Sequence, residues 1–436
     1  MALMKQISAR DRLEQALSRI ADPKGEGARA CLTVYTDAAR GAADGADARA
    51  RTGTALGPLD GAIVSLKDLF DVAGEVTRAG SRVVAEEGKP ATADAPVVQR
   101  LRAAGAVIVA KTNMVEFAFS GVGLNPHYGT PGNPTDRTRV PGGSTSGGAV
   151  AVADGMCEIA IGSDTGGSTR TPAALCGIVG WKPSRQRVPT EGAFPLSFTL
   201  DSIGPMARSV ANCASADAVM AGDAPAAIDG APLAGLRLGI PQGMPLDGLD
   251  ETVMAAWMQA TDTLGKAGAR LSDERIPLFE DMVRVNSVGG FAPPEALAVH
   301  RARLKRRGAD IDQNVRARIE RAAGMTAADY VEMTQARRRL IRAMDERLAD
   351  LDVLILPTTP ITAPKIAEVA TPETFAPKNM LLLRNTSMVN FFDLCAISLP
   401  LPRSGGLAVG LMLVARNGQD RRLFRIAAAV EKLLAG

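Results

Sequence analysis

Apolar residues in the second quarter of the chain fall into strand, helix and strand patterns in turn. Residues 61–66 form an apolar run of strand length that ends at Lys67. Residues 96–104 show helical spacing behind an initial proline, Gly105 ends that helix, and residues 106–110 form a second apolar run. This order predicts an α/β fold in which a mixed β-sheet is covered by helices on both faces.

The rest of the chain extends this pattern. Ser8 is a suitable N-cap for a helix, and Thr326 with Asp329 gives a capping-box pattern at the start of another. Residues 245–350 are predicted to be mainly helical and residues 363–380 to form a loop. Further strands are expected at 236–241, 353–356, 396–399 and 407–414, and a closing helix at 423–434. We predict one domain over residues 1–436, in which the helical region at about 245–350 shapes the substrate site.

Two glycine- and serine-rich runs carry the candidate chemistry. Residues 141–148 read PGGSTSGG and residues 162–170 read GSDTGGSTR, with the apolar residues 149–153, predicted to lie in a buried helix, between them. Glycine permits positive φ and removes the Cβ that would block a close approach, so both runs can fold tightly around a ligand. Each run alone is more typical of a tight turn or an anion cradle, but neither has the lysine of a P-loop or the dinucleotide-binding pattern G-x-G-x-x-G.

Histidine is scarce, because His127 and His300 are the only two in 436 residues. This scarcity weighs against a Ser-His-Asp triad, a cysteine–histidine pair and a multi-histidine metal site. A serine nucleophile would therefore need a lysine as its base. Lysines are usually solvated, but Lys67 ends an apolar strand, where burial would lower its pKa as a neutral base requires. Asp68 should point to the opposite face.

These motifs resemble those of the amidase signature family. The resemblance extends over residues 55–215 and returns at 352–430. The match implies a catalytic triad of Lys67, Ser144 behind a cis peptide bond, and Ser168 as the nucleophile. It rests on residues 141–148 and 162–170, VSLKD at 64–68, Pro172-Ala173, and CGIVGWKP at 176–183.

The resemblance implies an amidohydrolase that cleaves the C–N bond of a small to mid-sized, partly apolar amide through an acyl-enzyme. Ser168 would attack the amide carbon, and Ser144 would pass the proton to Lys67 and return it to the leaving amine. Asp164 and Arg170 would brace the loop, and no metal or organic cofactor is implied. The oxyanion hole would consist of the backbone N–H groups of Thr165, Gly166, Gly167 and Ser168. The pocket is expected to be lined from residues 115–130, 190–200 and 285–335.

Composition sets the expected partners and location. A net charge of +3 gives no electrostatic case for nucleic acid or an anionic membrane. The first six residues start no signal peptide, and no apolar run reaches the roughly 18 residues of a membrane span. Five scattered cysteines are expected to be buried free thiols, as in a cytoplasmic protein. We expect a small-molecule amide substrate, no nucleic-acid or membrane partner, and leave open whether the chain forms a homodimer.

Two other functions stay open on the sequence. The A subunit of glutamyl-tRNA amidotransferase, which takes ammonia from glutamine for a partner subunit, shares the resemblance, although the chain looks short for it. A non-enzymatic module that binds anions through the two Gly-Ser loops is the other. His127 is expected to be a polar residue near the pocket rim, and Trp181 to pack in the core. The basic residues Arg337, Arg338, Arg339 and Arg342 are expected to form a solvated helix face.

Overall fold

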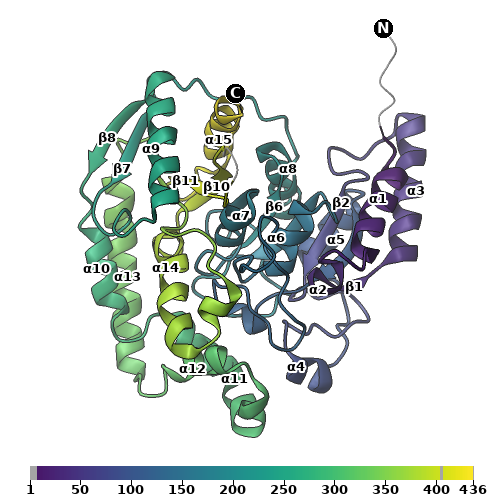
Figure 1. Cartoon of the computed structure of the whole chain (residues 1–436), viewed down its shortest axis with the longest axis horizontal. Helices are drawn as coiled ribbons and strands as arrows, with labels where there is room; N and C mark the ends of the chain where they lie inside the picture. Colours follow the sequence, from purple (N-terminus) through teal and green to yellow (C-terminus); the bar gives the residue numbers. More distant parts are fainter. Residues whose placement is uncertain (1–6, 403–405, 436) are drawn as a thin grey trace.

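A single mixed β-sheet forms the centre of the computed structural model, which describes residues 7–402 and 406–435 (Figure 1). In sheet order, the eleven strands of the described residues are β1 (Cys31–Val34), β3 (Val107–Thr112), β2 (Ile63–Lys67), β4 (Ile159–Ser163), β6 (Ile203–Ala207), β5 (Val179–Lys182), β10 (Cys395–Pro400), β11 (Gly410–Ala415), β9 (Val353–Pro357), β7 (Arg237–Pro241) and β8 (Arg270–Glu274). Strand β2 is parallel to β3 and β4, and β7 is parallel to β8 and β9. The remaining pairs are antiparallel, so the predicted mixed sheet is confirmed.

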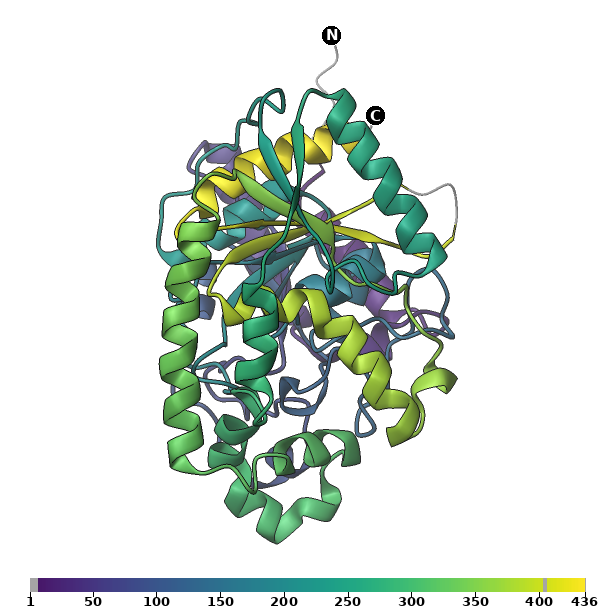
Figure 2. The ribbon, with the colours of Figure 1, turned by 90° about the vertical axis from the view of Figure 1, so that its left-hand side faces the viewer.

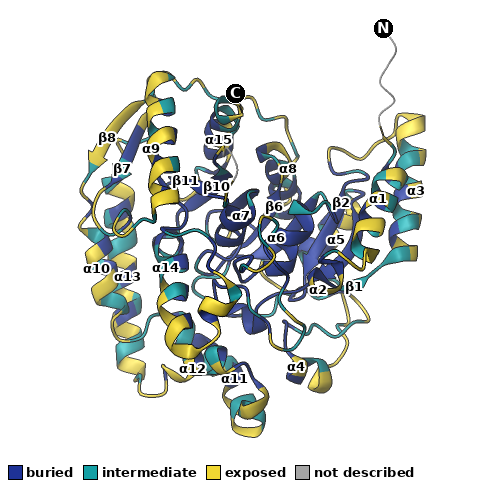
Figure 3. Ribbon diagram, viewed as in Figure 1, coloured by how far each residue is buried: buried dark blue, intermediate teal, exposed yellow. Residues whose placement is uncertain are grey.

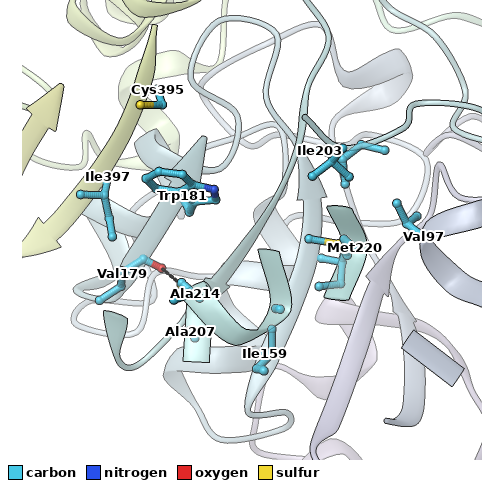
Figure 4. Packing of buried hydrophobic residues seen from close by; sticks show 14 of the residues in the cluster. Val97, Ile159, Val179, Trp181, Ile203, Ala207, Ala214, Met220, Cys395 and Ile397 are labelled. Atoms are coloured by element: carbon cyan, nitrogen blue, oxygen red, sulfur yellow. Dashed lines mark hydrogen bonds between the residues drawn. The ribbon is translucent and has the colours of Figure 1, made fainter. Parts of the chain in front are cut away.

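Both faces of the sheet are buried, because alternate residues along its strands enter different hydrophobic clusters. In β3, Val107 and Val109 pack on one face, whereas Ile108 packs on the other. Apolar strands without a polar face are expected where helices cover both faces of a sheet. Figure 4 shows part of one such core, with Trp181 of β5 close to Ile397 of β10. Trp181 is fully buried, as predicted.

Helices cover the two faces in separate groups (Figure 1). One face packs against α5 (Pro96–Ala103), α8 (Val210–Ala221), α9 (Glu251–Lys266) and α15 (Asp420–Leu434). The opposite face packs against α1 (Ala9–Ala21), α3 (Thr36–Thr52), α6 (Ser146–Ala153), α7 (Arg170–Cys176), α10 (Leu278–Asn286), α13 (Ala327–Arg347) and α14 (Pro372–Phe391). This arrangement confirms the predicted helical cover on both faces.

Two helices and several short elements remain. Helices α11 (Ala292–Arg307) and α12 (Gln313–Glu320) lie at the bottom of both ribbon views (Figure 1 and Figure 2). The remaining short elements are α2 (Gly27–Ala30), α4 (Arg82–Glu87), and the 3₁₀ turns η1 (Glu116–Ala118), η2 (Gly308–Asp310) and η3 (Ile366–Val369).

Several local predictions are confirmed. Ser8 caps α1 by accepting a hydrogen bond from Asp11 N, and Thr326 and Asp329 form the capping box of α13. Residues 245–350 are mainly helical, although β8 also lies within them. The first six residues, in which no signal peptide was expected, lie outside the described part of the chain.

The predicted loop at 363–380 is wrong for most of its length. The turn η3 occupies part of it, and α14 already begins at Pro372. Pro377 argues against a helix because it lacks an N–H, but it stands in the second turn, where only one helical bond is lost. Thr371 caps the helix, and Pro372 takes the first position, where proline fits.

The basic stretch of α13 is also only partly as expected. Arg338, Arg339 and Arg342 are exposed, but Arg337 is buried, where it donates to Asp393 and lies over the Phe291 ring. Figure 3 shows the buried central strands and the exposed outer sides of α9 and α13. All five cysteines are buried and free, as predicted. None of the helices in residues 7–402 and 406–435 combines the length and apolar content that a bilayer span requires.

Candidate active site

Lys67 is the last residue of β2, and its side chain is fully buried. Its Nζ donates hydrogen bonds to Ser144 Oγ at 2.7 Å and to Ser163 Oγ at 2.9 Å. Asp68 points elsewhere, as expected from strand alternation, because its carboxylate pairs with Arg78 at 3.2 Å. Lys67 is thus a buried lysine held among hydroxyl groups, and not a solvated surface residue.

Burial changes the acidity of Lys67. It lowers the pKa of the Lys67 ammonium to about 7, although the negative charges of Asp164 and Asp201 partly oppose this shift. The charged form of a lysine is disfavoured where water cannot solvate it. Near neutral pH a large share of Lys67 is therefore neutral, and a neutral amine can accept a proton.

Ser144 is brought to Lys67 by the loop that leads into α6. The peptide bond between Gly143 and Ser144 is cis, as predicted. Gly143 has no room for a side chain, because a Cβ there would lie 2.8 Å from Gly123 N and from Ser120 O. The glycines of the first run therefore allow close backbone packing around Ser144.

The second run forms a tight turn between β4 and α7, and Asp164 organises it. We call residues 164–168 the catalytic turn. The Asp164 carboxylate accepts hydrogen bonds from Gly167 N at 2.8 Å and from Thr169 N at 3.2 Å, and Arg170 donates to it at 2.8 and 3.0 Å. Burial alone would raise the pKa of Asp164, but the charge and hydrogen bonds of Arg170 hold it well below its usual range. The ionised pair braces the turn from the side that faces α14, where Asn390 also donates to Asp164 at 2.9 Å.

The backbone of the catalytic turn offers donors to the pocket. The N–H groups of Thr165, Gly166 and Ser168 have no hydrogen-bond partner among the described residues. The prediction for Gly167 needs correction, because its N–H already donates to Asp164 and is not available to an oxyanion. Glycine is required there for its φ of 131° and because a Cβ would lie 2.1 Å from Thr386 Oγ1.

A backbone hydrogen bond joins the loops that carry Ser144 and Ser168. Thr145 N donates to the Ser168 carbonyl at 3.3 Å, which holds the two loops together. No hydrogen bond joins the two serine Oγ atoms within residues 7–402 and 406–435, so the expected contact of Ser144 with both partners is formed only toward Lys67. Catalytic hydrogen bonds are often loose before substrate binds and tighten in the complex.

A cavity of about 210 Å³ opens at Ser168. The three segments expected to line it all contribute, and α14 adds a fourth that the sequence did not indicate. The lining is mostly apolar and contains two arginines but no acidic side chain. Its residues are Ala118, Phe119, Ser120, Thr165, Gly166, Ser168, Leu196, Leu200, Asn286, Gly289, Gly290, Phe291, Ala292, Pro293, Arg318, Arg321, Leu383, Ser387 and Phe391.

Two further residues beside the site were not found from the sequence. Ser163 Oγ accepts from Lys67 Nζ, and Asp201 accepts from Thr165 Oγ1 at 2.5 Å. Ser163 ends β4, which runs parallel to the strand of Lys67, so the strand pairing could have indicated it. Asp201 stands in an irregular segment and carried no such signal.

Neither histidine belongs to the cavity lining. His127 Nε2 lies 3.1 Å from Glu116 Oε2, and His300 stacks on Phe117 with ring centroids 3.9 Å apart. Burial lowers the pKa of His300 to about 3, so it stays neutral near pH 7. In the described part of the chain, no three His, Cys, Asp or Glu side chains gather as ligands of a metal ion would.

Comparison with known proteins shows the family of the chain. A model of the Amidase family matches residues 11–424. The chain is 36% identical over 401 residues to 2-amino-5-chloromuconic acid deaminase of Comamonas testosteroni, covering 91% of this chain and 86% of that protein. It is 37% identical over 468 residues to the A subunit of glutamyl-tRNA(Gln) amidotransferase from Anaeromyxobacter sp. (strain K), covering 99% and 94%. A crystal structure of an amidase superposes with a TM-score of 0.86 at 31% identity, covering 98% of this chain and 96% of that one.

The chain therefore belongs to the amidase family and has the fold of amidase signature enzymes. It is a hydrolase that acts on amide C–N bonds. The chain looked short for the amidotransferase protein, but it spans 94% of that relative, so its length does not exclude this function.

Proposed function

We propose that this protein hydrolyses amides with Ser168 as nucleophile, Ser144 as proton relay and Lys67 as base. The observation that carries the proposal is the hydrogen bond of 2.7 Å between the buried Lys67 Nζ and Ser144 Oγ, beside a turn whose serine opens on a cavity. A pKa of about 7 for Lys67 supports its role, because a general base is most effective when its pKa lies near the pH of the reaction.

The reaction follows from these positions. Ser168 Oγ attacks the amide carbon, its proton passes to Ser144, and the proton of Ser144 passes to Lys67. The N–H groups of Thr165, Gly166 and Ser168 hold the negative charge that develops on the carbonyl oxygen. Lys67 then returns the proton through Ser144 to the leaving nitrogen as the C–N bond breaks. Water hydrolyses the acyl-enzyme by the same proton path in reverse.

The cavity supports a substrate that carries a negative charge, such as a carboxylate. Arg318 Nε is buried and has no hydrogen-bond partner among the described residues, and its guanidinium lies 4.6 Å from the centre of the Phe119 ring. Burial and the charge of Arg321 lower the pKa of Arg318 to about 10, and no carboxylate opposes this shift. Arg318 remains charged near neutral pH, so an anionic ligand would supply the partner that the protein does not.

One relative supports an acidic substrate, because it is named for 2-amino-5-chloromuconic acid. Another relative is a subunit of an amidotransferase. The second candidate function is therefore that of the amidotransferase protein, which the 99% coverage of this chain favours.

The buried free thiols support the further proposal of a cytoplasmic location. We also propose that residues 1–436 form one domain, and this proposal does not depend on whether the chain forms a homodimer.

The test is ammonia release by the purified chain from paired amides that differ only in one carboxylate. We expect hydrolysis of the carboxylated member, and a rise of its KM by about tenfold or more in Arg318→Gln, as for the loss of one charge-assisted hydrogen bond. The uncharged member should respond little. Equal losses on both members would contradict the assignment of Arg318. Hydrolysis of glutamine alone would favour the amidotransferase function.

A further inference from the structure

Residues 196–202, which we call the wall segment, form one side of the cavity and also contact the catalytic turn. Leu196 and Leu200 line the cavity. At the other end, Ser202 N and Oγ donate to the Asp164 carbonyl at 3.2 and 2.8 Å, and the Ser202 carbonyl accepts from Asp164 N at 2.7 Å. A movement of this segment would therefore affect both the shape of the cavity and the catalytic turn.

Asp201 ties the wall segment to the catalytic turn. Its carboxylate accepts a hydrogen bond from Thr165 Oγ1 at 2.5 Å, and from Leu196 N and Ser197 N at 3.0 Å each. Burial, with a smaller contribution from the charge of Glu295, raises the pKa of Asp201 to about 6, against the effect of these hydrogen bonds. Three donors from two segments thus meet on one carboxylate.

Glu295 is a second carboxylate that holds the wall segment. It stands on α11, is only 5% exposed, and forms no ion pair among the described residues, although the charge of Arg337 acts on it from a distance. Its four hydrogen bonds all come from hydroxyl or backbone groups. Ser197 Oγ, Thr199 Oγ1 and Tyr330 OH each donate at 2.5 Å, and Thr199 N donates at 3.0 Å. A buried carboxylate of this kind is costly unless every donor is in place, so it fixes the relative position of the parts it joins.

We infer that Asp201 and Glu295 are positioning residues of the hydrolytic reaction, with separate tasks. Asp201 aligns the catalytic turn through Thr165, whereas Glu295 fixes the wall segment against the helical region and so sets the shape of the cavity. Neither carboxylate lines the cavity, so each acts through the residues that it holds. The inference rests on the proposed amide hydrolysis and adds to it which residues govern turnover and which govern substrate fit.

The two tasks predict different kinetic effects. In Glu295→Gln, an amide NH₂ would face hydroxyl donors, the wall segment would loosen, and substrate would bind in a poorly shaped cavity. We expect KM to rise about tenfold and kcat to change less than about twofold. The reason is that the bound substrate and the transition state would lose the same amount of binding energy.

In Asp201→Asn, the catalytic turn loses its anchor at Thr165. We expect kcat to fall about tenfold or more, with a smaller change in KM, because the donors to the oxyanion act in the transition state. The charged groups that act on Lys67 are Asp164 and Asp201, and both favour its protonated form. Removing the Asp201 charge should therefore move the acidic limb of the rate profile to lower pH, which a purely structural defect would not do.

The experiment compares these two variants with wild type and with Glu280→Gln, a control at an exposed carboxylate on neighbouring α10. Steady-state kinetics across about pH 5 to 9 would be combined with amide hydrogen exchange. Exchange should quicken at Thr199 in Glu295→Gln, and at Leu196 and Ser197 in Asp201→Asn, and nowhere near the wall segment in the control.

The results separate the possible failures. If both variants lower kcat alike, or if the pH profile of Asp201→Asn stays in place, the division of tasks is wrong. Should Asp201→Asn fail to fold, Thr165→Val removes the same hydrogen bond and should reproduce the loss in kcat. If wild type hydrolyses no amide, the proposed function fails. The hydrogen-exchange pattern would then still show whether the two carboxylates hold the wall segment.

Discussion

Replacing Lys67 by methionine removes the group that, in the proposed mechanism, titrates near neutral pH. With a pKa of about 7, roughly one tenth of Lys67 is neutral at pH 6 and roughly nine tenths at pH 8. The wild-type kcat/KM should therefore rise about tenfold between these pH values and then level off. A lysine with an ordinary pKa would instead give a rise of about a hundredfold over the same interval, still climbing at pH 8.

The assay follows kcat/KM for ammonia release against pH in wild type, Lys67→Met and Lys111→Met. Lys111 is a matched control, because it is also fully buried on a neighbouring strand but contacts Asp68 and not the serines. Lys67→Met should lose about 10²- to 10⁴-fold in rate, and its residual activity should lack the acidic limb. Lys111→Met should keep that limb even if its stability falls. A limb that persists unchanged in Lys67→Met would show that another group titrates, and the assignment of the base would be refuted.

The ion pair between Asp164 and Arg170 and the glycines of the catalytic turn give two further predictions. Arg170→Met leaves the Asp164 carboxylate buried without its cation, and the free energy of unfolding measured in urea should fall by about 3–5 kcal/mol. An unchanged midpoint would show that the pair contributes nothing to stability. Gly167→Ala should abolish activity, because φ is 131° and the added Cβ would lie 2.1 Å from Thr386 Oγ1. Gly166→Ala, whose Cβ would meet only a side-chain carbon at 3.8 Å, should fold normally, and equal melting temperatures for the two variants would contradict the steric argument.

The sequence was sufficient where local residues decide the structure. The glycines around Ser144 and Ser168 mark backbone that packs closely, and the apolar strand before Lys67 predicts its burial. The same local logic located the capping box at Thr326. These features depend on a few neighbouring residues, so a single sequence reveals them.

The sequence was insufficient where distant segments meet. Glu295 bonds to Ser197, 98 positions away, and no pattern along the chain joins them. The burial of Arg337 likewise depends on its contact with Asp393, after the end of α14. Gly167 was misassigned because its N–H is taken by Asp164, a contact that only the folded turn reveals. Long-range packing overrides local preference in the first two cases, whereas the contact between Gly167 and Asp164 is local and depends on the conformation of the folded turn.

In the proposed mechanism, Ser168 forms a covalent bond with the acyl group of the substrate. The most direct test is treatment of the wild type with phenylmethanesulfonyl fluoride, a reagent that sulfonylates activated serines, followed by peptide mass spectrometry. We predict a single adduct on Ser168, loss of amide hydrolysis in step with its formation, and no adduct in Ser168→Ala. An adduct on Ser144 in place of Ser168, or amide hydrolysis retained by Ser168→Ala, would contradict the account.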